Sequence, residues 1–432
     1  MAVHGHTIVS EKCIGCVACT KACPTKAIRV RGGLARVDSG LCIDCGACVR
    51  ICQVDAARPT TSPPSDLKKF RHSVALPSLT LYGQFGKEVD PDQVLRALSR
   101  IGFDGYYDIS WMCEMIAAAT DAYLTECREP WPKISVTCPA IVRLIQIRYP
   151  TLIENLVPLE TPRELSAKLL RRKLSTEMGL APEEIGIFFI TPCTAIMNSI
   201  LNPVGLEQSY LDGALSIREV YGPLYRAVQK AGRTETADRF SPGGLLWAMA
   251  GGEIAGMRSA NTLTVRGEAD VQYVFDHIEA GKFQSVDFIE AYICPDGCVS
   301  GGLTVEGRYA AQRSIQEIVK RLAKRTGSRD HVQEEKVRSM LREHFFDMEE
   351  EIKARPIQPL AGDLRRAIAM KREQNAILDQ LPHKDCAACG SPDCVTLAEE
   401  IVRGEAALED CVFVKIDRLE QRLPPREEGQ DE

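Results

Sequence analysis

The sequence YICPDGCVSGGLTVEG, from Tyr292 to Gly307, decides how the rest of the chain is interpreted. Cys294 and Cys298 follow an apolar run that is typical of a strand, and glycines crowd around them. A cubane iron–sulfur cluster takes four thiolates, so this pair supplies only half of a site. The sequence therefore predicts that further cysteine ligands come from other parts of the chain.

The composition is that of an ordinary globular protein with several domains. The chain has 432 residues, of which 45% are hydrophobic and 26% charged, and a chain of this length is expected to form two or three domains. The formal net charge of -6 argues against nucleic acid as a main partner. No stretch is long and apolar enough to predict a membrane span.

Cysteine usage indicates metal binding. The chain has 18 cysteines, and a cysteine cluster that begins at Cys13 leaves no room for a signal peptide. We therefore expect a cytoplasmic protein with reduced, clustered cysteines that bind metal. The HGH sequence at His4 and His6 is interpreted as an exposed end rather than as a metal site.

Two cysteine runs near the N-terminus carry the most specific signal. CIGCVACTKACP begins at Cys13, CIDCGACVRICQ begins at Cys42, and both have the C-x2-C-x2-C-x3-C spacing of bacterial ferredoxins. In that pattern the fourth cysteine of each run binds the cluster of the other run. The predicted ligands of the two [4Fe-4S] clusters are Cys13, Cys16, Cys19 and Cys52 for one, and Cys42, Cys45, Cys48 and Cys23 for the other. Electron relay is the expected role; zinc binding and a purely structural pair of clusters are the alternatives.

Three strand-like runs in the middle of the chain each lead to cysteine. ISVTCP ends in Cys138-Pro139, the apolar run Ile185 to Ile190 leads to Cys193, and VDFIEAYICPDGC contains the opening pair. Short continuous apolar runs are typical of buried parallel strands, and the ends of parallel strands open on one crevice. Four thiolates at these ends could hold one cubane. From spacing alone, four isolated buried thiols are the alternative.

Helical patterns separate these runs. Amphipathic or apolar helices are expected at VDPDQVLRALSRIG, WMCEMIAAATDAYLTEC and AIVRLIQIRYP, and another begins at Thr161-Pro162. KVRSMLREHFFDMEEEIKARP, from Lys336, is predicted to be a helix that closes the domain. Cys113 and Cys127 lie in the second of these segments and are interpreted as core residues.

The three cysteine segments resemble, in order, the signature segments of the [FeFe]-hydrogenase large subunit. VTCPAIV is similar to TSCCPGW, ITPCTAIM to MPCxxKxxE, and EAYICPDGCVSGG to ExMACxxGCxxGGGQP. SPGGLLWAMAGG, from Ser241, resembles the glycine-rich active-site loop of that family. The resemblance implies that Cys138, Cys193, Cys294 and Cys298 bind a [4Fe-4S] cubane. It also implies that the sulfur of Cys298 bridges to a two-iron unit that carries CO, CN⁻ and a dithiolate, where the family activates hydrogen.

The C-terminal sequence HKDCAACGSPDCVTLAEEIVRGEAALEDC adds a fourth cluster motif. Its predicted [4Fe-4S] ligands are Cys386, Cys389, Cys394 and Cys411. The segment follows a charged helix expected at Leu364 to Gln374, and it resembles the small four-cysteine domain of sensory hydrogenases and of some corrinoid and electron-transport proteins. Zinc is the alternative, because it also accepts four thiolates.

The chain is thus predicted to be a multidomain α/β and α+β protein. It would contain a ferredoxin-like dicluster domain, an [FeFe]-hydrogenase-like α/β core with cysteines at strand ends, and a small helical C-terminal iron–sulfur domain. Because RPTTSPPSD, from Arg58, is too rich in proline, serine and threonine to bury much surface, a linker is placed there. The predicted segments are domain 1–58, linker 59–73, domain 74–355, domain 356–423 and tail 424–432.

Several positions depart from the family pattern. Thr137 stands where the family has its proton-donating cysteine, and a threonine hydroxyl is a poor proton relay at neutral pH. Ile196 replaces the lysine that holds a cyanide, and Ser199 replaces a glutamate. Tyr292 replaces a methionine and could offer its hydroxyl to a ligand, although simple packing is the alternative, and the Gln-Pro after the glycines is missing.

The usual proton route is also incomplete upstream. Glu114 matches one relay glutamate, but the position of its partner falls near Ala117 and that of a relay serine near Val157. General acid–base help is worth about 10²–10⁴-fold, so fast turnover by the usual route is not expected.

Two functions are compatible with these departures. One is a hydrogen or redox sensor with low H2 oxidation or proton reduction activity, for which Cys298 and Thr137 are the catalytic candidates. Its expected partners are H2 and protons, a redox partner such as ferredoxin or another hydrogenase, and a signalling kinase or phosphatase. The other is an electron-transfer or scaffold protein that has lost the diiron unit and keeps only its clusters.

Overall fold

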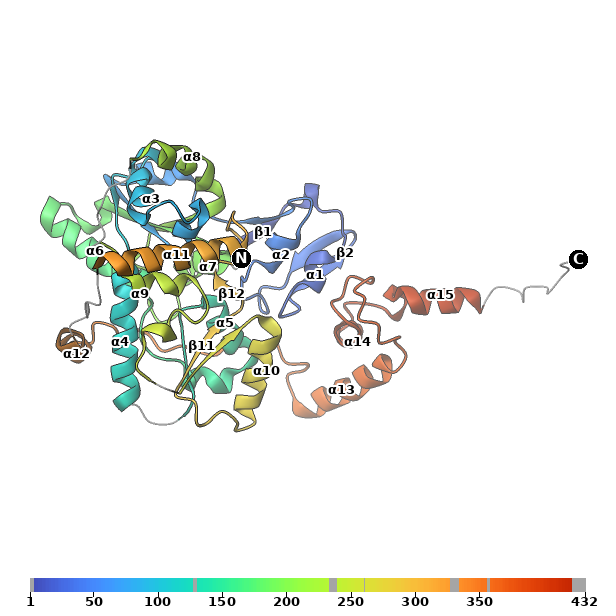
Figure 1. Cartoon of the computed structure of the whole chain (residues 1–432). Coiled ribbons are helices and arrows are strands. Elements are labelled where there is room, and N and C mark those ends of the chain that lie inside the picture. The colour runs from blue at the N-terminus through green and yellow to red at the C-terminus, as the bar shows by residue number, and fades with distance from the viewer. Residues whose placement is uncertain are drawn as a thin grey trace, which may run out of the picture. The chain divides into compact units, whose positions relative to one another are not determined.

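The computed structural model describes residues 4–126, 130–232, 239–259, 261–326, 334–355 and 358–421 (Figure 1). Its contacts divide the chain into two compact units. The larger unit contains Pro59–Arg355, the residues up to Thr7 and the loop Ile43–Gly46. The smaller unit contains Ile8–Cys42, Ala47–Arg58 and the described part of 356–432. The cysteine-rich segments from the two ends of the sequence therefore share one unit.

Two parallel sheets form the framework of the larger unit. The first has the order β6 (Gly105–Tyr106), β5 (His72–Pro77), β8 (Ile185–Thr191) and β9 (Gly213–Ser216). The second has the order β10 (Thr262–Arg266), β11 (Phe288–Tyr292) and β7 (Lys133–Ile134).

The expectation of buried parallel strands is confirmed, because β8 is buried along its whole length. The three cysteine-bearing strands do not share one sheet. β11 has β10 and β7 on its two sides, and β8 has β5 and β9, so no edge is free to join them. The cysteines therefore reach one place from the ends of strands in two sheets.

Most helices of the larger unit lie between these strands in the sequence, and two follow the last strand. Those of the larger unit are α3 (Pro91–Leu98), α4 (Ser110–Glu126), α5 (Pro139–Arg148), α6 (Pro162–Met178), α7 (Thr194–Leu201), α8 (Ile217–Lys230), α9 (Pro242–Leu245), α10 (Glu268–Glu279), α11 (Arg308–Thr326) and α12 (Glu334–Arg342). The helices predicted before Cys138 are confirmed by α3 and α4, and those predicted between Cys138 and Cys193 by α5 and α6. Among the described residues, no helix is both long and apolar enough to cross a membrane.

The long helix predicted from Lys336 is wrong in its second half. α12 ends at Arg342, and His344 then takes a positive φ of 56°. Beyond that turn the backbone pairs with another segment: Asp347 forms a bridge with Leu159, and the Glu160 N–H donates to the carbonyl of Phe346 at 2.7 Å. These long-range backbone contacts replace the helical hydrogen bonds.

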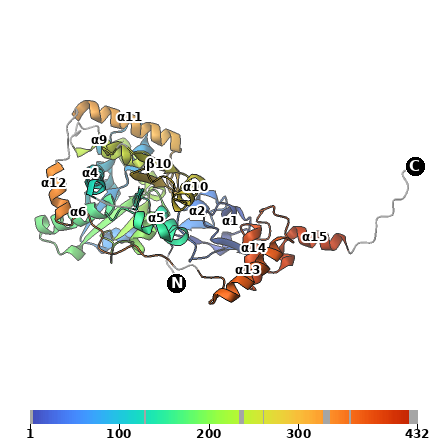
Figure 2. The same cartoon turned by 90° about the horizontal axis from the view of Figure 1, so that it is seen from below.

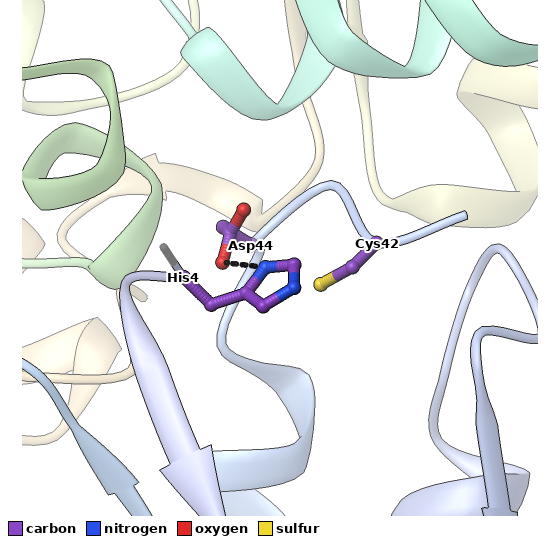
Figure 3. A group of neighbouring side chains, drawn as sticks. All are labelled: His4, Cys42 and Asp44. Atoms are coloured by element: carbon purple, nitrogen blue, oxygen red, sulfur yellow. Dashed lines mark ion pairs between the residues drawn. The ribbon is translucent and has the colours of Figure 1, made fainter. Parts of the chain in front are cut away.

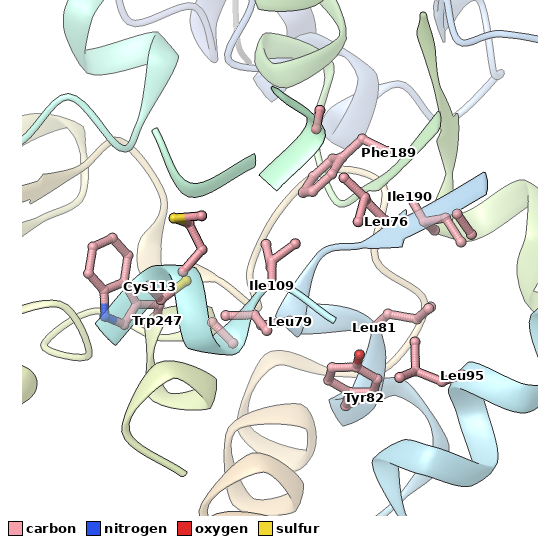
Figure 4. Packing of buried hydrophobic residues seen from close by; sticks show 14 of the residues in the cluster. Leu76, Leu79, Leu81, Tyr82, Leu95, Ile109, Cys113, Phe189, Ile190 and Trp247 are labelled. Carbon is pink, nitrogen blue, oxygen red and sulfur yellow. The ribbon is translucent and has the colours of Figure 1, made fainter. Parts of the chain in front are cut away.

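The core of the larger unit surrounds β5, β8 and α4. Figure 4 shows Leu76, Ile109 and Trp247 in this cluster of buried side chains. Cys113 is 1% exposed and packs among them, which confirms it as a core cysteine. Cys127 lies outside the described residues.

The smaller unit combines short ferredoxin-like elements with a helical segment. Its elements are α1 (Ala18–Lys21), β2 (Ile28–Arg31), β3 (Leu34–Val37), α2 (Ala47–Ile51), α13 (Leu364–Leu378), α14 (Cys394–Val402) and α15 (Val412–Glu420). β2 and β3 form an antiparallel hairpin. The short strands β1 (His6–Ile8) and β4 (Ala57–Pro59), which pair with each other, each include residues of both units. α13 and α14 pack side by side (Figure 2), and α13 confirms the charged helix that was predicted there. The predicted tail falls outside the described residues.

A buried carboxylate fastens the C-terminal segment to the hairpin. Glu400, which is 5% exposed, accepts hydrogen bonds from the guanidinium groups of Arg29 and Arg31. Arg31 also donates to the carbonyl of Cys389 at 2.8 Å. Gly390 lies so close to the hairpin that a Cβ there would meet the Val30 carbonyl at 1.9 Å. The loop that carries Cys389 is therefore fixed against strand β2.

Replacing Glu400 with glutamine is expected to weaken this contact. Hydrogen bonds to a charged group contribute about 1.5–3 kcal/mol, so we expect a loss of about 2 kcal/mol in the free energy of unfolding of the smaller unit. Urea unfolding of the cluster-loaded protein measures this loss. Glu399→Gln is the matched control, because Glu399 pairs with Arg403 at the surface, where such pairs contribute about 0–1 kcal/mol. Equal effects of the two variants would contradict the prediction.

Candidate metal centre

The central cysteines stand at the turns that follow three strands. Cys138 is the N-cap residue of α5, shortly after β7, and Cys193 is the N-cap residue of α7, directly after β8. Cys294 follows β11, and Cys298 ends β12 (Pro295–Cys298). The first turn of a helix presents free backbone N–H groups and a partial positive charge, which favour a thiolate. Two of the four predicted ligands are therefore placed where the backbone stabilises their ionised form.

The four thiols lie close enough to affect one another's ionisation. Burial raises the pKa of Cys298 well above its ordinary value, and the thiols of Cys193, Cys138 and Cys294 raise it further. Burial also raises the pKa of Cys193 to about 11, and the neighbouring Cys138 adds to this rise. Four thiolates this close together repel one another, so the arrangement favours a positive metal centre between them. A thiol that coordinates such a centre loses its proton. The predicted cubane ligands are thus brought together, although their role as ligands stays a prediction.

The separation of the sulfurs fits a cluster better than a single ion. Four sulfurs bound to one zinc ion at about 2.3 Å would lie about 4 Å from one another. Within the described ranges, no group of three or more ligand atoms of His, Cys, Asp or Glu within 4.8 Å contains two cysteines. The central and C-terminal cysteine sets are therefore spread more widely than a zinc site. A cubane holds its four ligand sulfurs further apart than a single ion does, because its irons and sulfides lie between them.

Close backbone contacts hold the third cysteine segment in place. The Val299 N–H donates to the Ala248 carbonyl at 3.0 Å, and the Leu303 N–H donates to the Pro192 carbonyl at 2.8 Å. Gly297 has a φ of 76°, and a Cβ there would meet the Ala250 nitrogen at 2.5 Å. Only glycine allows this approach, so the glycine-rich loop packs directly against the segment that carries Cys298.

Two buried donors beside these cysteines have no hydrogen-bond partner. They are the hydroxyl of Tyr292, which is 2% exposed, and Nε of Arg163, which is 8% exposed. Burial raises the pKa of Tyr292 far above its ordinary value, and the nearby Glu290 and Cys298 raise it further, so the hydroxyl keeps its proton. A buried donor without an acceptor costs about 1–3 kcal/mol. A cubane with four thiolates needs neither donor, so both fit a site that also holds a group with polar ligands.

A buried pair of carboxylates, Glu253 and Glu290, lies in the same region. The Ser135 hydroxyl donates to Glu253 at 2.7 Å, and the Gly251 N–H donates to Glu290 at 2.9 Å. Burial raises the pKa of both carboxyls, and the charge of Glu290 raises that of Glu253 further. Two coupled carboxylates of this kind titrate as one system, and the pair keeps a proton near neutral pH.

This pair adjoins Thr137 and was missed by the sequence analysis. A hydrogen bond from the Thr137 side chain lowers the pKa of Glu253 against the larger effect of burial, and the Thr137 N–H donates to the Ser135 hydroxyl at 3.2 Å. The only signal in the sequence was that Glu290 stands at the glutamate of the ExMAC-like segment. Nothing in the sequence indicated that Glu253 would meet it.

The positions at which the family has its proton-relay and cyanide-binding residues mostly hold other side chains in this chain. Ala117 and Val157 are buried apolar core residues, which can carry no proton. Ile196 is likewise buried in the core, whereas Ser199, one turn later on α7, accepts a hydrogen bond from Arg163 at 3.4 Å. Glu114 lies on α4 against Gly243, where a Cβ would meet its carboxylate oxygen at 2.5 Å.

A loop with one ferredoxin-type cysteine belongs to the larger unit and packs beside Cys193. The loop Ile43–Gly46 includes Cys45, and the hydroxyl of Thr194 donates to the Asp44 carbonyl at 2.6 Å. This hydrogen bond joins the residue before Cys45 to the residue after Cys193. It provides a short path of bonds between a predicted outer ligand and a predicted central ligand.

The Asp44 carboxylate anchors this loop. It is 1% exposed, it accepts from Arg143 at 3.1 Å, and it lies 3.3 Å from Nδ1 of His4 (Figure 3). Burial would raise the pKa of Asp44, but the adjacent rings of His4 and His6 and the charge of Arg143 hold it well below its usual range. The expectation that the N-terminal histidines form an exposed end is wrong, because this buried anion draws them inward.

One cavity in the smaller unit is lined by four of the predicted cluster ligands. They are Cys13, Cys16, Cys19 and Cys52. Burial raises the pKa of Cys52, but N–H groups of Ala57, Ala56 and Val54 lower it below its ordinary value. Such N–H···S hydrogen bonds stabilise a thiolate and tune a cluster's reduction potential. The cysteine from the second run thus lies with three from the first, as the ferredoxin spacing predicts.

Three cysteines of the C-terminal motif share one small core. Cys389, Cys394 and Cys411 pack with Leu381 and Leu397. The Cys394 N–H donates to the carboxylate of Asp385, the residue just before Cys386, at 2.9 Å. The loop and helix predicted for this motif therefore bring its cysteines together, while their ligand role stays a prediction.

Family models match all three cysteine-bearing regions. The model of the iron-only hydrogenase large subunit, C-terminal domain, matches residues 71–242 and 248–302. A 4Fe-4S dicluster domain matches residues 6–53, and a putative Fe-S cluster domain matches residues 381–413.

Two curated proteins and a solved structure are similar to this chain. Iron hydrogenase 1 of Clostridium pasteurianum is 24% identical over 266 residues, which cover 50% of this chain and 46% of that protein. The chain thus matches about half the length of that relative. The periplasmic [Fe] hydrogenase large subunit of Nitratidesulfovibrio vulgaris is 26% identical over 369 residues, which cover 69% of this chain and 86% of that protein. An [FeFe]-hydrogenase structure studied for oxygen inactivation has a TM-score of 0.50 at 15% identity and covers 68% of this chain and 97% of that one, which supports the fold.

Proposed function

Because the chain belongs to the iron-only hydrogenase large-subunit family, we propose that it is a hydrogen or redox sensor with slow turnover at its central site. It is a hydrogenase-like iron–sulfur protein with the domains of an electron carrier. The observation that carries the proposal is a chain of hydrogen bonds: the Thr137 N–H donates to the Ser135 hydroxyl, and that hydroxyl donates to Glu253 of the buried carboxylate pair. The cysteine thiol that donates protons in the family is missing, but a carboxyl pair that can hold a proton lies beside the site.

The central cysteines would hold the cofactors in the way that the family resemblance implies. Cys138, Cys193 and Cys294 would bind the cubane, and Cys298 would bind it and bridge to a diiron unit. When bound, that unit supplies the metal at which hydrogen is split or formed. The residues around it position it, exclude water and exchange protons.

Proton exchange would run through Glu253 and Glu290. Because burial keeps a proton on this pair near neutral pH, the pair can donate it through the hydroxyl groups of Ser135 and Thr137. A threonine hydroxyl transfers protons more slowly than a thiol, since its pKa is far from neutral. Slow exchange suits detection, which needs the site to respond to hydrogen rather than to consume it.

Electrons would pass between the central site and the outer clusters. The hydrogen bond from Thr194 to Asp44 supports a route by way of Cys45. Within the smaller unit, Arg31 contacts the loop of Cys389, which supports exchange between the ferredoxin-like and C-terminal clusters. We propose a ferredoxin or another hydrogenase as the redox partner and a kinase or phosphatase as the receiver of the signal.

Infrared spectroscopy tests whether the diiron unit is present. After the cluster-loaded protein is incubated with a synthetic diiron cofactor, we expect bands of iron-bound CO and CN⁻ that persist through gel filtration. Iron and sulfide analysis before this step is expected to give about four cubanes per chain. Absence of the CO and CN⁻ bands would refute the proposal that the protein is a sensor that binds a diiron unit.

A protein that only transfers electrons is the second candidate. The observation in its favour is Ile196, which is apolar and buried where the family has a cyanide-binding lysine. This candidate predicts the full number of cubanes without any infrared bands of CO and CN⁻. It would still use the contacts around Asp44 and Glu400 to pass electrons along the chain.

Replacing Thr137 with cysteine is expected to raise the turnover of the loaded protein. A thiol has a pKa much nearer to neutral than a hydroxyl, and a well-placed acid–base group is worth about 10²–10⁴-fold, so we expect an increase of about tenfold or more. Hydrogen evolution with a reduced dye as electron donor measures it. Thr137→Ser is the control, because it keeps a hydroxyl and should change little. An unchanged rate in a Thr137→Cys protein that shows the CO and CN⁻ bands would contradict the relay.

A further inference from the structure

Glu160 is a buried carboxylate that stands directly before α6. It is 3% exposed, and its backbone N–H donates to the Phe346 carbonyl at 2.7 Å, which fixes the backbone there. Its Oε1 accepts from the N–H of Thr161 at 2.6 Å and from the hydroxyl of Thr161 at 2.9 Å. Its Oε2 has no hydrogen-bond partner among the described residues. One oxygen of this carboxylate is therefore held, and the other is left without a donor.

An inner cavity connects Glu160 with the buried carboxylate pair. Its polar lining residues are Thr120, Ser135, Thr137, Glu160, Thr161 and Glu253. Thr120, on α4, is 3% exposed, and its hydroxyl likewise has no partner within the described part of the chain. Ordered water is what usually satisfies buried polar groups that line a polar cavity. We therefore expect water in this cavity, between Glu253 and Glu160.

An outer cavity continues from Glu160 towards the surface. Glu160, Thr161 and Val136 line both cavities. The outer cavity also reaches four partly exposed residues, Pro203, Val204, Met348 and Ile352. Glu160 is thus shared by a cavity that reaches Glu253 and a cavity that reaches partly exposed side chains.

The charges around Glu160 allow it to change its protonation state. Burial raises the pKa of Glu160 to about 7, and the charge of Glu164 adds to this rise, while the Thr161 N–H and the charge of Arg163 lower it. Arg143 also lines the outer cavity, but its guanidinium is paired with Asp44 at 3.1 Å. A carboxyl whose pKa lies near neutral accepts and releases protons readily.

We propose that Glu160 carries protons between the carboxylate pair of Glu253 and Glu290 and the solvent. The inference deepens the proposed function, on which it rests for the use that is made of the protons. Protonated Glu253 gives its proton to a water molecule in the inner cavity, and that water gives one to ionised Glu160. Glu160 then releases a proton to water in the outer cavity, and the reverse order brings a proton in. No electron moves, and each water molecule ends as it began.

This exit differs from the positions at which the family relays protons. Two of those positions hold Ala117 and Val157, which are buried and apolar. Val157 itself lines the inner cavity, where it offers no group that can carry a proton. Glu160 stands three residues beyond Val157 and brings a carboxylate to the same cavity, so the route to solvent leaves at a different residue.

Exchange with D2O tests this route without the diiron unit. A protonated carboxyl of the Glu253–Glu290 pair has an infrared C=O band that shifts when deuterium replaces the proton, and the loss of that band in Glu253→Gln identifies it. After rapid mixing of the cluster-loaded protein with D2O, we expect the shift to be at least about tenfold slower in Glu160→Gln than in wild type, because glutamine carries no proton. Glu160→Asp keeps a carboxyl and should exchange at a rate between the two.

Glu164→Gln is the matched control. Glu164 is also 3% exposed, but its oxygens accept from the Ser209 hydroxyl and the Tyr210 N–H, and it does not line the inner cavity. Its exchange should match that of wild type. Equal slowing in Glu160→Gln and Glu164→Gln would overturn the inference, because a lost charge beside Arg163 would then explain both.

Glu160→Asp decides the question if Glu160→Gln does not fold. Its shorter side chain displaces the carboxyl, and a displaced proton carrier is less efficient, so the exchange should be severalfold slower than in wild type. Exchange at the wild-type rate in this variant would overturn the inference.

The results separate this inference from the proposed function. Absence of CO and CN⁻ bands in wild type would refute the proposed function and leave the exchange measurement intact. Wild-type exchange in Glu160→Gln would overturn only the inference, and so would a wild type without the carboxyl band, since the pair would then hold no proton to pass on. In the loaded protein, Glu160→Gln should evolve hydrogen about tenfold more slowly with unchanged CO and CN⁻ bands, which distinguishes a lost proton carrier from a lost cofactor.

Discussion

Replacing Cys298 with alanine is expected to abolish binding of the diiron unit and to remove the central cubane. Alanine offers no ligand atom, and the cubane would be left with three thiolates instead of four. The iron content should fall by about four atoms per chain, and the infrared bands of CO and CN⁻ should be lost completely. Because three outer cubanes would remain, their absorbance and electron paramagnetic resonance signals should persist.

Cys113→Ala is the matched control for this loss. Cys113 is also buried. Burial raises the pKa of Cys113 well above its ordinary value, and the nearby Cys298 makes a smaller contribution in the same direction. It lies in the apolar core, however, and not at a strand end that faces the other thiols. We expect Cys113→Ala to keep all its iron and its CO and CN⁻ bands, at a cost of about 1 kcal/mol for the small cavity. Loss of the central cluster in both variants would show that burial near the site, and not ligation, explains the first result.

The cysteine framework could be predicted from the sequence because ligand spacing is a local property. The x2-x2-x3 spacing predicted that Cys13 and Cys52 lie together, and both line one cavity. The strand–cysteine pattern predicted that Cys193 and Cys298 lie together, and the thiol of Cys193 is close enough to raise the pKa of Cys298. The pattern did not reveal that β8 and β11 belong to different sheets. Strand pairing depends on long-range contacts, and continuous apolar runs fit either sheet equally well.

The polar surroundings of the site could not be predicted. Glu253 follows a glycine pair in a loop and Glu290 lies within a strand, and only the folded chain places them together. Arg163 is one of many basic residues in a helix that reads as exposed, yet it is buried against Ser199. The same holds for Glu400, whose partners Arg29 and Arg31 are more than three hundred residues away. Each of these contacts depends on distant segments, which residue spacing does not encode.

Replacing Glu253 with glutamine is expected to lower the turnover of the loaded protein by about 10²-fold, the lower end of the effect of removing an acid–base group. Glutamine keeps the size and can still accept the hydrogen bond from Ser135, but it cannot exchange a proton. Hydrogen evolution with a reduced dye measures the rate, and the infrared bands establish equal loading. Glu114→Gln is the control, since Glu114 belongs to the interrupted family route and should matter little. If Glu114→Gln were slow and Glu253→Gln were unaffected, proton transfer would be assigned to the family's usual route through Glu114.

The same variant should change how stability depends on pH. The pKa of Glu253 is raised in the folded state by burial and by Glu290, so between the ordinary carboxyl pKa and the raised value the folded state binds more protons than the unfolded state. Stability is therefore greatest at low pH within this window and falls as the pH rises from about 5 to about 8. Because Glu253→Gln removes one of the two charges, its urea midpoint should decline less over this range than that of wild type. An equal decline in both proteins would mean that the pair does not store a proton, and the slow relay through Thr137 would lose its source.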